Sequence, residues 1–380
     1  MTSITDEIKA LGQTVLVLQG GGALGAYQAG VFQALHETGV EPDWIIGTSI
    51  GAINASIIAG SAPGERLDKL REFWRRVEHG RHVGGALPAW MAATTRNMLA
   101  ITGGVPGFFA PNMAAFLSLH APLGAESAGY YSVSRLRRTL EDLIDFPRIN
   151  AGPMRLTVGA SNVRTSEMRY FDSRDMALDL PHVMASGALP PAFPAVRIDG
   201  ELYWDGGILS NTPVEAVFDD VPRRNSFVVA VHLWNPQGPE PKSIWEVMNR
   251  QKDLQYSSRA ATHIARQRQL HKLRHIIAEL AAFLPEEMRR DNLVADMASY
   301  GCLSRMHVIR LLAPRLDYED HAKDIDFSPQ GIAQRWRAGY DDTCHTLEKG
   351  PWRLPHDPTE GFILHEACGG RIMQHRGAAE

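Results

Sequence analysis

Cysteine is scarce in this sequence. Cys302, Cys344 and Cys368 are its three cysteines among 380 residues, all late in the chain and without a Cys-x-x-Cys spacing. Such a set provides neither the paired cysteines of a disulfide framework nor the usual ligands of a structural zinc ion. We therefore expect reduced thiols, as in a cellular interior, and no metal.

Long apolar runs and an excess of one charge are also lacking. The first residues, MTSITDEIKALGQ, are polar, and the apolar run after them reaches glycines too soon for a signal peptide or a membrane span. The formal net charge of −4 gives no overall attraction to nucleic acid. We therefore expect a cytoplasmic protein without a nucleic-acid partner, and a peripheral membrane contact stays open.

What the sequence contains is an alternation of buried strands and helices. Residues 14–19 (TVLVLQ) and 44–49 (WIIGTS) have the apolar, β-branched composition of strands buried on both faces. Residues 26–38 and 50–60 follow them with helical spacing. This order predicts an α/β fold, a three-layer sandwich with helices on both faces of a mostly parallel sheet.

The later sequence divides into a core and an extension. We assign residues 12–236 to the core, residues 80–130 within it to a lid or binding insertion, and residues 237–380 to a mainly helical extension that packs on the core. The extension should contain a long basic helix over 243–283 and a strand at MHVIRLLA. The tail from Gly350 is rich in Pro and Gly, which predicts loose order.

Glycines after the first strand allow two interpretations. Gly20, Gly22 and Gly25 form Gly-x-Gly-x-x-Gly, a spacing found in dinucleotide-binding proteins. That function also needs an acidic residue at the end of the second strand, to bind the ribose hydroxyls. Asp43 precedes this strand, so we expect it at the opposite edge of the sheet. A nucleotide-dependent oxidoreductase is therefore kept only as a rival hypothesis.

The end of the second strand carries a serine instead. Gly47 and Gly51 flank Ser49 as Gly-x-Ser-x-Gly, between a predicted strand and a predicted helix. A serine in such a turn presents its hydroxyl at the carboxyl edge of the sheet. Alone, the pattern equally fits an ordinary turn. The neighbouring glycine loop favours acyl transfer, because backbone amides there would stabilise an oxyanion, and we expect these amides to be those of Gly20, Gly21 and Gly22.

A nucleophilic serine needs a base to take its proton. None of the fifteen histidines follows a strand at that edge, since His182 lies in a turn and His232 within an apolar strand. Asp205 ends a predicted strand and precedes Gly206 and Gly207, a turn that would let its carboxylate reach the serine. The same residues also fit an ordinary hairpin turn.

Three segments in this order, QGGGALGAYQAGV, GTSIGAINA and DGGILSNTP, resemble the patatin-like phospholipases, as does ASGALPPAFPAV between the last two. The resemblance covers about residues 14–235 and implies a Ser49 nucleophile, an Asp205 base, the oxyanion loop above and no cofactor. One position departs from the family, which often has Arg or Lys where this chain has Leu24. Phospholipids, neutral acylglycerols, lysolipids, thioesters and hydroxyacid polyesters all stay open as substrates.

Two further regions suggest contacts. Residues 80–130 form either an apolar lid that meets lipid or a satellite core beneath a long loop. The apolar side chains that would form either one are Trp90, Met91, Met98, Phe108, Phe109, Met113 and Phe116. The basic helix forms either a solvated face or a docking surface, through Arg250, Lys252, Arg259, Arg266, Arg268, Lys272 and Arg274. We expect His271 and His275 on the helix surface, without the further ligands of a metal site.

These observations together predict a serine acyl hydrolase that acts on a lipid or another acyl ester through a Ser49–Asp205 dyad. A non-catalytic lipid-binding or scaffolding protein of the same fold is the second rival. The sequence leaves the oligomeric state open.

Overall fold

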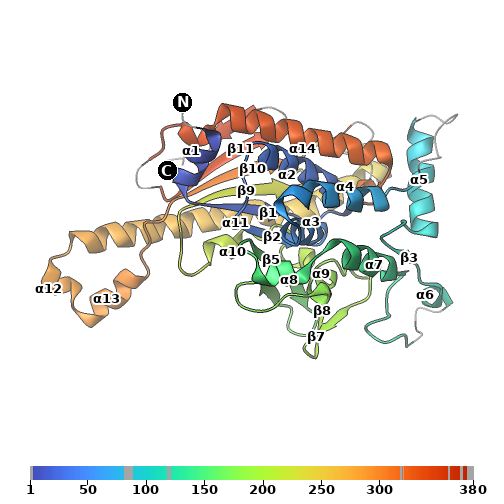
Figure 1. Ribbon diagram of the computed structural model, residues 1–380, viewed down its shortest axis with the longest axis horizontal. Coiled ribbons are helices and arrows are strands. Elements are labelled where there is room, and N and C mark those ends of the chain that lie inside the picture. Colours follow the sequence, from blue (N-terminus) through green and yellow to red (C-terminus); the bar gives the residue numbers. More distant parts are fainter. Residues whose placement is uncertain are drawn as a thin grey trace.

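The computed structural model describes residues 3–80, 89–117, 120, 122–316, 319, 321–357, 360–368 and 371–374. A mostly parallel sheet runs through its centre (Figure 1). Its strand order is β12-β11-β10-β9-β1-β2-β5-β8-β7, with β6 paired to β5. The strands are β1 Gln13–Leu18, β2 Trp44–Thr48, β5 Arg155–Asn162, β6 Met168–Asp172, β7 Val196–Ile198, β8 Glu201–Asp205, β9 Ser226–His232, β10 Met306–Leu312, β11 Phe362–Cys368 and β12 Arg371–Gln374.

Strand β1 shows why the sheet lies at the centre. Its side chains alternate between two buried apolar layers, Leu16 and Leu18 on one face and Val15 and Val17 on the other. Because both faces of the strand must be covered, helices pack on each side, and the strand pairs in parallel with β2 and β9.

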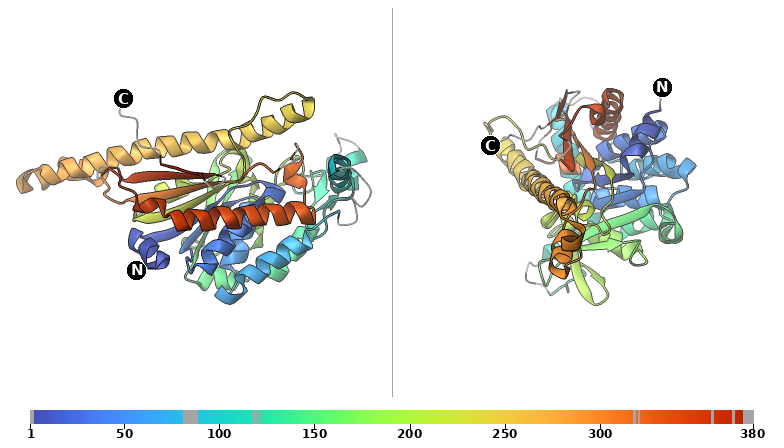
Figure 2. Two further views of the ribbon diagram at one scale, coloured as in Figure 1. Left: turned by 90° about the horizontal axis from the view of Figure 1, so that it is seen from above. Right: turned by 90° about the vertical axis from the view of Figure 1, so that its left-hand side faces the viewer.

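The two helical layers are seen from the side in Figure 2. One face carries α1 Ile4–Leu11, α2 Ala26–Glu37, α3 Ile50–Ala59, α4 Arg66–Arg76 and α14 Pro329–Lys349. The other carries α10 Glu215–Phe218 and the long α11 Ile244–Phe283. This is the predicted three-layer α/β sandwich.

The remaining helices and a small two-stranded sheet lie around this core. They are α5 Ala89–Gly103, β3 Ala110–Pro111, α6 Met113–Leu117, β4 Tyr131–Ser132, α7 Ser134–Leu143, α8 Phe146–Ala151, α9 Leu180–Ser186, α12 Glu286–Arg289 and α13 Asn292–Ser299. Helices α5 and α6 lie at one end of the molecule, and α12 and α13 lie at the other (Figure 1). Of the helices described, none is both long enough and apolar enough to cross a bilayer.

The C-terminal region is mainly helical and is also part of the sheet. The predicted strand at MHVIRLLA is β10, which pairs in parallel with β9 over 226–232. The prediction of a loose tail is wrong for residues 362–368, which form the largely buried strand β11 beside β10. Pro and Gly are confined to the flanks of this segment, whose apolar residues supply the burial that a strand requires.

Candidate active site

Ser49 occupies a strained turn between β2 and α3. Its backbone has φ 57° and ψ −125°, a conformation that costs a non-glycine residue about 1–3 kcal/mol. The flanking glycines allow the turn to close. A Cβ on Gly47 would lie 2.4 Å from backbone atoms of Gly51, and a Cβ on Gly51 would lie 2.3 Å from the carbonyl oxygen of Leu18. Larger residues at either position would therefore push the strand and the helix apart.

Ser186, at the end of α9, holds this turn in place. The Ser49 amide donates to the Ser186 hydroxyl oxygen at 3.0 Å, and that hydroxyl donates to the Gly159 carbonyl at 2.6 Å. The Ser49 amide is thus engaged. Sequence reasoning did not identify Ser186, although the segment ASGALPPAFPAV that contains it was part of the resemblance.

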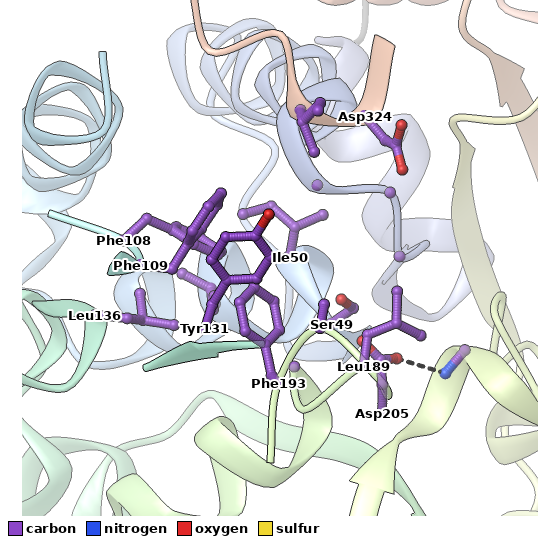
Figure 3. Close-up of a pocket in the computed structure, with 18 of the residues that line it drawn as sticks. Ser49, Ile50, Phe108, Phe109, Tyr131, Leu136, Leu189, Phe193, Asp205 and Asp324 are labelled. Atoms are coloured by element: carbon purple, nitrogen blue, oxygen red, sulfur yellow. Dashed lines mark hydrogen bonds between the residues drawn. The ribbon is translucent and has the colours of Figure 1, made fainter. Parts of the chain in front are cut away.

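Asp205 meets Ser49 from the end of β8, as Figure 3 shows. Asp205 is 2% exposed, its side chain lies beside that of Ser49, and its carboxylate accepts a hydrogen bond from the Gly207 amide at 2.7 Å. Burial raises the pKa of Asp205 from 3.8 to about 7, because loss of hydration outweighs the opposite effects of the neighbouring Ser49 hydroxyl and the Gly207 amide. A carboxylate with this pKa can exchange a proton near neutral pH. Gly206 packs tightly beside it, since a Cβ there would lie 2.5 Å from the Gly159 carbonyl oxygen.

The glycine loop lies against the same two residues. Gly20 is fixed by three hydrogen bonds. Its amide donates to the Asn211 carbonyl at 3.2 Å. Its carbonyl accepts from the side-chain amide of Asn211 at 3.2 Å and from the indole N–H of Trp234 at 2.8 Å. The Gly21 and Gly22 amides make no hydrogen bond within the described residues. Two donors of the loop are therefore free beside Ser49.

Gly22 cannot be replaced without moving the loop. It begins the short helix η1 Gly22–Gly25 with φ +56°, and a Cβ there would lie 2.2 Å from the carbonyl oxygen of Asp324. Gly25 packs against Ile50, whose side chain would lie 2.6 Å from an added Cβ. The loop thus fits between α3 and a segment of the C-terminal region.

These groups open into an apolar cavity of about 200 Å³, much larger than the about 10–15 Å³ that holds one water. Ser49, Asp205 and all three glycines of the loop line it, together with apolar side chains that include Ile53 and Phe327. Figure 3 shows others of this group, Phe108, Phe109, Tyr131 and Phe193, gathered on one side of Ser49. A pocket of this kind suits a hydrocarbon chain next to a reacting carbonyl.

The insertion at 80–130 contributes to the cavity in part. Phe108 and Phe109 are buried and line it, as a satellite core would, whereas Met98, Met113 and Phe116 are 57%, 72% and 57% exposed. Residues 81–88 and the side chains of Trp90 and Met91 lie outside the described residues. Phe108 and Phe109 thus form part of a core beneath the insertion, and the interpretation as a lid that meets lipid stays a prediction.

The C-terminal region completes the cavity, which sequence reasoning missed. Tyr256 of α11 and residues 324, 325 and 327 line it. A buried ion pair fixes this segment, since Lys323 Nζ lies 2.6 Å from Asp253 Oδ1, and Arg315 also pairs with Asp253. Lys323 begins the short helix η4 Lys323–Ile325, which packs on η1 and so supports the glycine loop.

Several other predicted residues lie away from the cavity. Asp43 accepts a hydrogen bond from the Thr14 amide at 2.8 Å, at the amino end of β1, so it lies at the edge opposite the glycine loop. His182 bonds to the Asp179 amide at 3.0 Å and belongs to the cap of α9. His232 is fully buried in β9. None of the three lines the cavity.

The basic helix differs in part from its predicted role. His271 and His275 are buried, so their expected surface position is wrong; they lie on the face of α11 that packs on the body of the protein. Lys252 pairs with Asp324 at 2.6 Å, and Arg268 pairs with Glu360 at 2.5 Å. These two cations of the helix are therefore engaged within the protein. The Arg259 side chain lies outside the described residues. Within the described part of the chain, no three metal-ligating side chains cluster.

Comparison with known proteins identifies the family of this chain. The profile of the family described as patatin-like phospholipase matches residues 16–218, and a second, described as patatin phospholipase, matches residues 254–359. Similar proteins include lysophospholipase nte1 of Aspergillus terreus, 25% identical over 62% of this chain and 14% of its own length. An NTE family protein of Mycobacterium bovis is 28% identical over 54% of this chain and 28% of its own. Triacylglycerol lipase ptl3 of Schizosaccharomyces pombe is 45% identical over 16% of this chain and 13% of its own.

This chain thus spans less than a third of the length of each of these relatives. Among solved structures, VipD from Legionella pneumophila matches with a TM-score of 0.37 and 16% identity, over 89% of this chain and 67% of its own, a likeness too distant to bear on function. Since the first family profile covers more than half of the 380 residues, this protein belongs to the patatin-like phospholipase family.

Proposed function

We propose that this protein is a serine hydrolase that cleaves carboxylic esters of lipids, with Ser49 as nucleophile and Asp205 as base. The observation that carries the proposal is that Ser49 and the buried carboxyl group of Asp205, whose pKa is raised to about 7, lie next to each other in the lining of one apolar cavity. The names lysophospholipase and triacylglycerol lipase of two relatives are consistent with this chemistry.

The reaction proceeds in two halves. Ser49 Oγ attacks the acyl carbon while Asp205 takes the hydroxyl proton, and the tetrahedral oxyanion accepts hydrogen bonds from the free amides of Gly21 and Gly22. Gly20 contributes by anchoring the loop through Asn211 and Trp234. Collapse of the intermediate expels the alcohol, which takes the proton from Asp205, and leaves an acyl-enzyme. Asp205 then takes a proton from the water that attacks the acyl carbon and passes it to Ser49 Oγ as the fatty acid leaves, which restores both residues.

The charge around the cavity favours an uncharged ester over one that carries phosphate. Of the described residues that line the cavity, only Asp205 and Asp324 belong to the charged types, and both are acidic. These lining residues therefore present no Lys or Arg to an anionic head group. The nearby cation Lys252 already forms an ion pair with Asp324, at 2.6 Å. Leu24, where the family often has a base, is buried in the apolar core. Neutral acylglycerols should therefore turn over faster than phospholipids with the same acyl chain.

A peripheral membrane contact fits the end of the molecule where α5 and α6 lie. Met98, Met113 and Phe116 are exposed there, and Ile101 of α5 lines the cavity, so an acyl chain could pass from a lipid surface to Ser49. Charged replacements of Met113 and Phe116 should lower activity on emulsified substrate and leave activity on a soluble short-chain ester unchanged.

A fluorophosphonate probe tests the catalytic proposal directly. The wild type and the control Ser299→Ala, at an exposed serine, should label, and Ser49→Ala should not. A panel of glycerides, lysolipids and phospholipids of one chain length, run with the same three proteins, then defines the substrate. Equal labelling of Ser49→Ala would refute the assignment of the nucleophile and indicate that another residue reacts. Absence of labelling in the wild type would favour a lipid-binding protein.

A further inference from the structure

Helix α11 changes character along its 40 residues. Up to His275 it has buried residues at helical spacing, among them Asp253, Ile264 and His271, and that face packs on the body. After His275 none of its residues is buried. This last part of α11, together with α12 and α13, forms an arm over residues 276–303 that projects from the body (Figure 1).

The arm is a defined hairpin. Helix α13 packs back on α11, and a Cβ on Gly301 would lie 2.8 Å from the backbone nitrogen of Ala278, so the chains touch closely there. The Cys302 amide donates to the Arg274 carbonyl at 3.0 Å and ties the end of the hairpin to α11. The arm can therefore present one fixed surface to a partner.

That surface is an apolar seam on α11, formed by Leu273, Ile276, Leu280 and Phe283, which are 50%, 40%, 61% and 82% exposed. Their spacing of three, four and three residues is the a/d repeat through which helices pair in coiled coils. The seam lies on the side of α11 away from the body, because His271 and His275 face inward. Leu293, Met297 and Tyr300 of α13 add further exposed apolar side chains to the arm.

We propose that this seam binds the seam of a second copy of the chain, in an antiparallel, two-fold pair of arms. The charges favour this partner. Exposed Lys272 lies at one end of the seam, and exposed Glu286 and Glu287 follow its other end. Glu286 also forms an ion pair with Arg290 at this surface, so Glu287 is the carboxylate best placed to meet the partner's lysine. An antiparallel pair brings the Lys272 end of each copy beside the Glu286–Glu287 end of the other, and the two-fold repeats the contact.

A lipid surface is a less suitable partner for the arm. From 272 to 303 the sequence has four Lys and Arg against five Asp and Glu, whereas helices that lie on anionic membranes carry a basic polar face. The arm also lies at the opposite end of the molecule from α5 and α6, so pairing through it leaves the cavity end free (Figure 1).

Sedimentation velocity of the full chain over a wide concentration range tests the proposal. The wild type should form a dimer, and Leu280→Glu combined with Phe283→Glu should be monomeric with an unchanged far-UV circular dichroism spectrum. The matched control Leu354→Glu, at a residue 46% exposed elsewhere on the surface, should still dimerise. A wild type that stays monomeric at every concentration would overturn the proposal, as would a dimer that the seam variant does not weaken.

Charge exchange tests the antiparallel register. Lys272→Glu should raise the dimer Kd a few-fold, and the further change of Glu286→Lys and Glu287→Lys in the same chain should restore it. Failure of this rescue would rule out the antiparallel arrangement. Flotation with vesicles of phosphatidylcholine and phosphatidylglycerol tests whether the arm binds a lipid surface instead. Vesicle binding by a monomeric wild type, lost in the seam variant, would refute self-association in favour of lipid.

Discussion

The pKa of Asp205 makes the pH dependence of this protein a demanding test. An ordinary aspartate titrates near 3.8 and would be ionised at every pH from 5 to 9, whereas burial raises the pKa of Asp205 to about 7. The base form is the ionised one. Activity should therefore rise with pH through 7 and reach a plateau above it.

The size of the effect follows from the same value. At one pH unit below the pKa about a tenth of the carboxyl groups are ionised, and at two units about a hundredth. We expect kcat/KM to be about tenfold below its plateau at pH 6 and about a hundredfold below it at pH 5. The assay uses a short-chain neutral ester, whose ionisation does not change over this range. A flat profile between pH 5 and 8 would show that Asp205 is not a buried base.

The ionised carboxylate of Asp205 should lower the free energy of unfolding at neutral and higher pH. Because the folded pKa of Asp205 lies above its ordinary value, the folded state holds the proton more tightly, and this contribution is lost as pH rises from 3.8 through about 7. The difference corresponds to an upper limit of about 4 kcal/mol above pH 7. Asp205→Asn, which is uncharged, should therefore be inactive and yet more stable at pH 8, by chemical denaturation. Loss of both activity and stability would instead indicate a structural role.

Three further predictions follow from contacts around the site and in the sheet. Gly22→Ala should lower kcat by about two orders of magnitude, because the added Cβ would lie 2.2 Å from the Asp324 carbonyl oxygen and would displace the loop that carries the oxyanion donors. Kinetics on the neutral ester measure this effect, and a normal kcat would contradict the assignment of the loop. Asp253→Asn leaves buried Lys323 without its carboxylate and should cost about 3–5 kcal/mol in urea unfolding, well above the effect of an exposed pair. Burial lowers the pKa of His307 and His365 to about 4, so stability should fall as pH drops from 6.5 toward 4, and urea titrations should show a smaller fall in His365→Gln.

The sequence allowed prediction of the fold and of three segments of the site because each depends on a local pattern. The ends of β1, β2 and β8 carry the glycine loop, Ser49 and Asp205, and each end is marked by glycines next to an apolar run. Strands β1 and β2 are parallel, so their carboxyl ends, which carry the glycine loop and Ser49, could be expected at one edge of the sheet. Strand β8 runs antiparallel to β5, so the position of Asp205 beside Ser49 depends on the register of these two strands and does not follow from strand direction.

The supporting contacts could not be predicted in this way. Ser186, Asn211 and Trp234 act through single hydrogen bonds to the backbone of the site, and no periodicity marks a serine, an amide or an indole for that role. Tyr256 and Asp324 reach the cavity from the C-terminal region, which carries none of the motifs. Their positions depend on how α11 and η4 pack, which is a property of the whole chain.

The pairing of β9 with β10 has a practical consequence for protein engineering. A fragment ending at residue 236 would keep Ser49 and Asp205 but would expose the edge of β9 that now bonds to residues 306–312. It would also uncover the apolar layer beneath α11. An unprotected edge of this kind recruits strands from other molecules, so the fragment should aggregate during expression. Hybrid proteins that borrow this cavity must therefore include both halves of the chain.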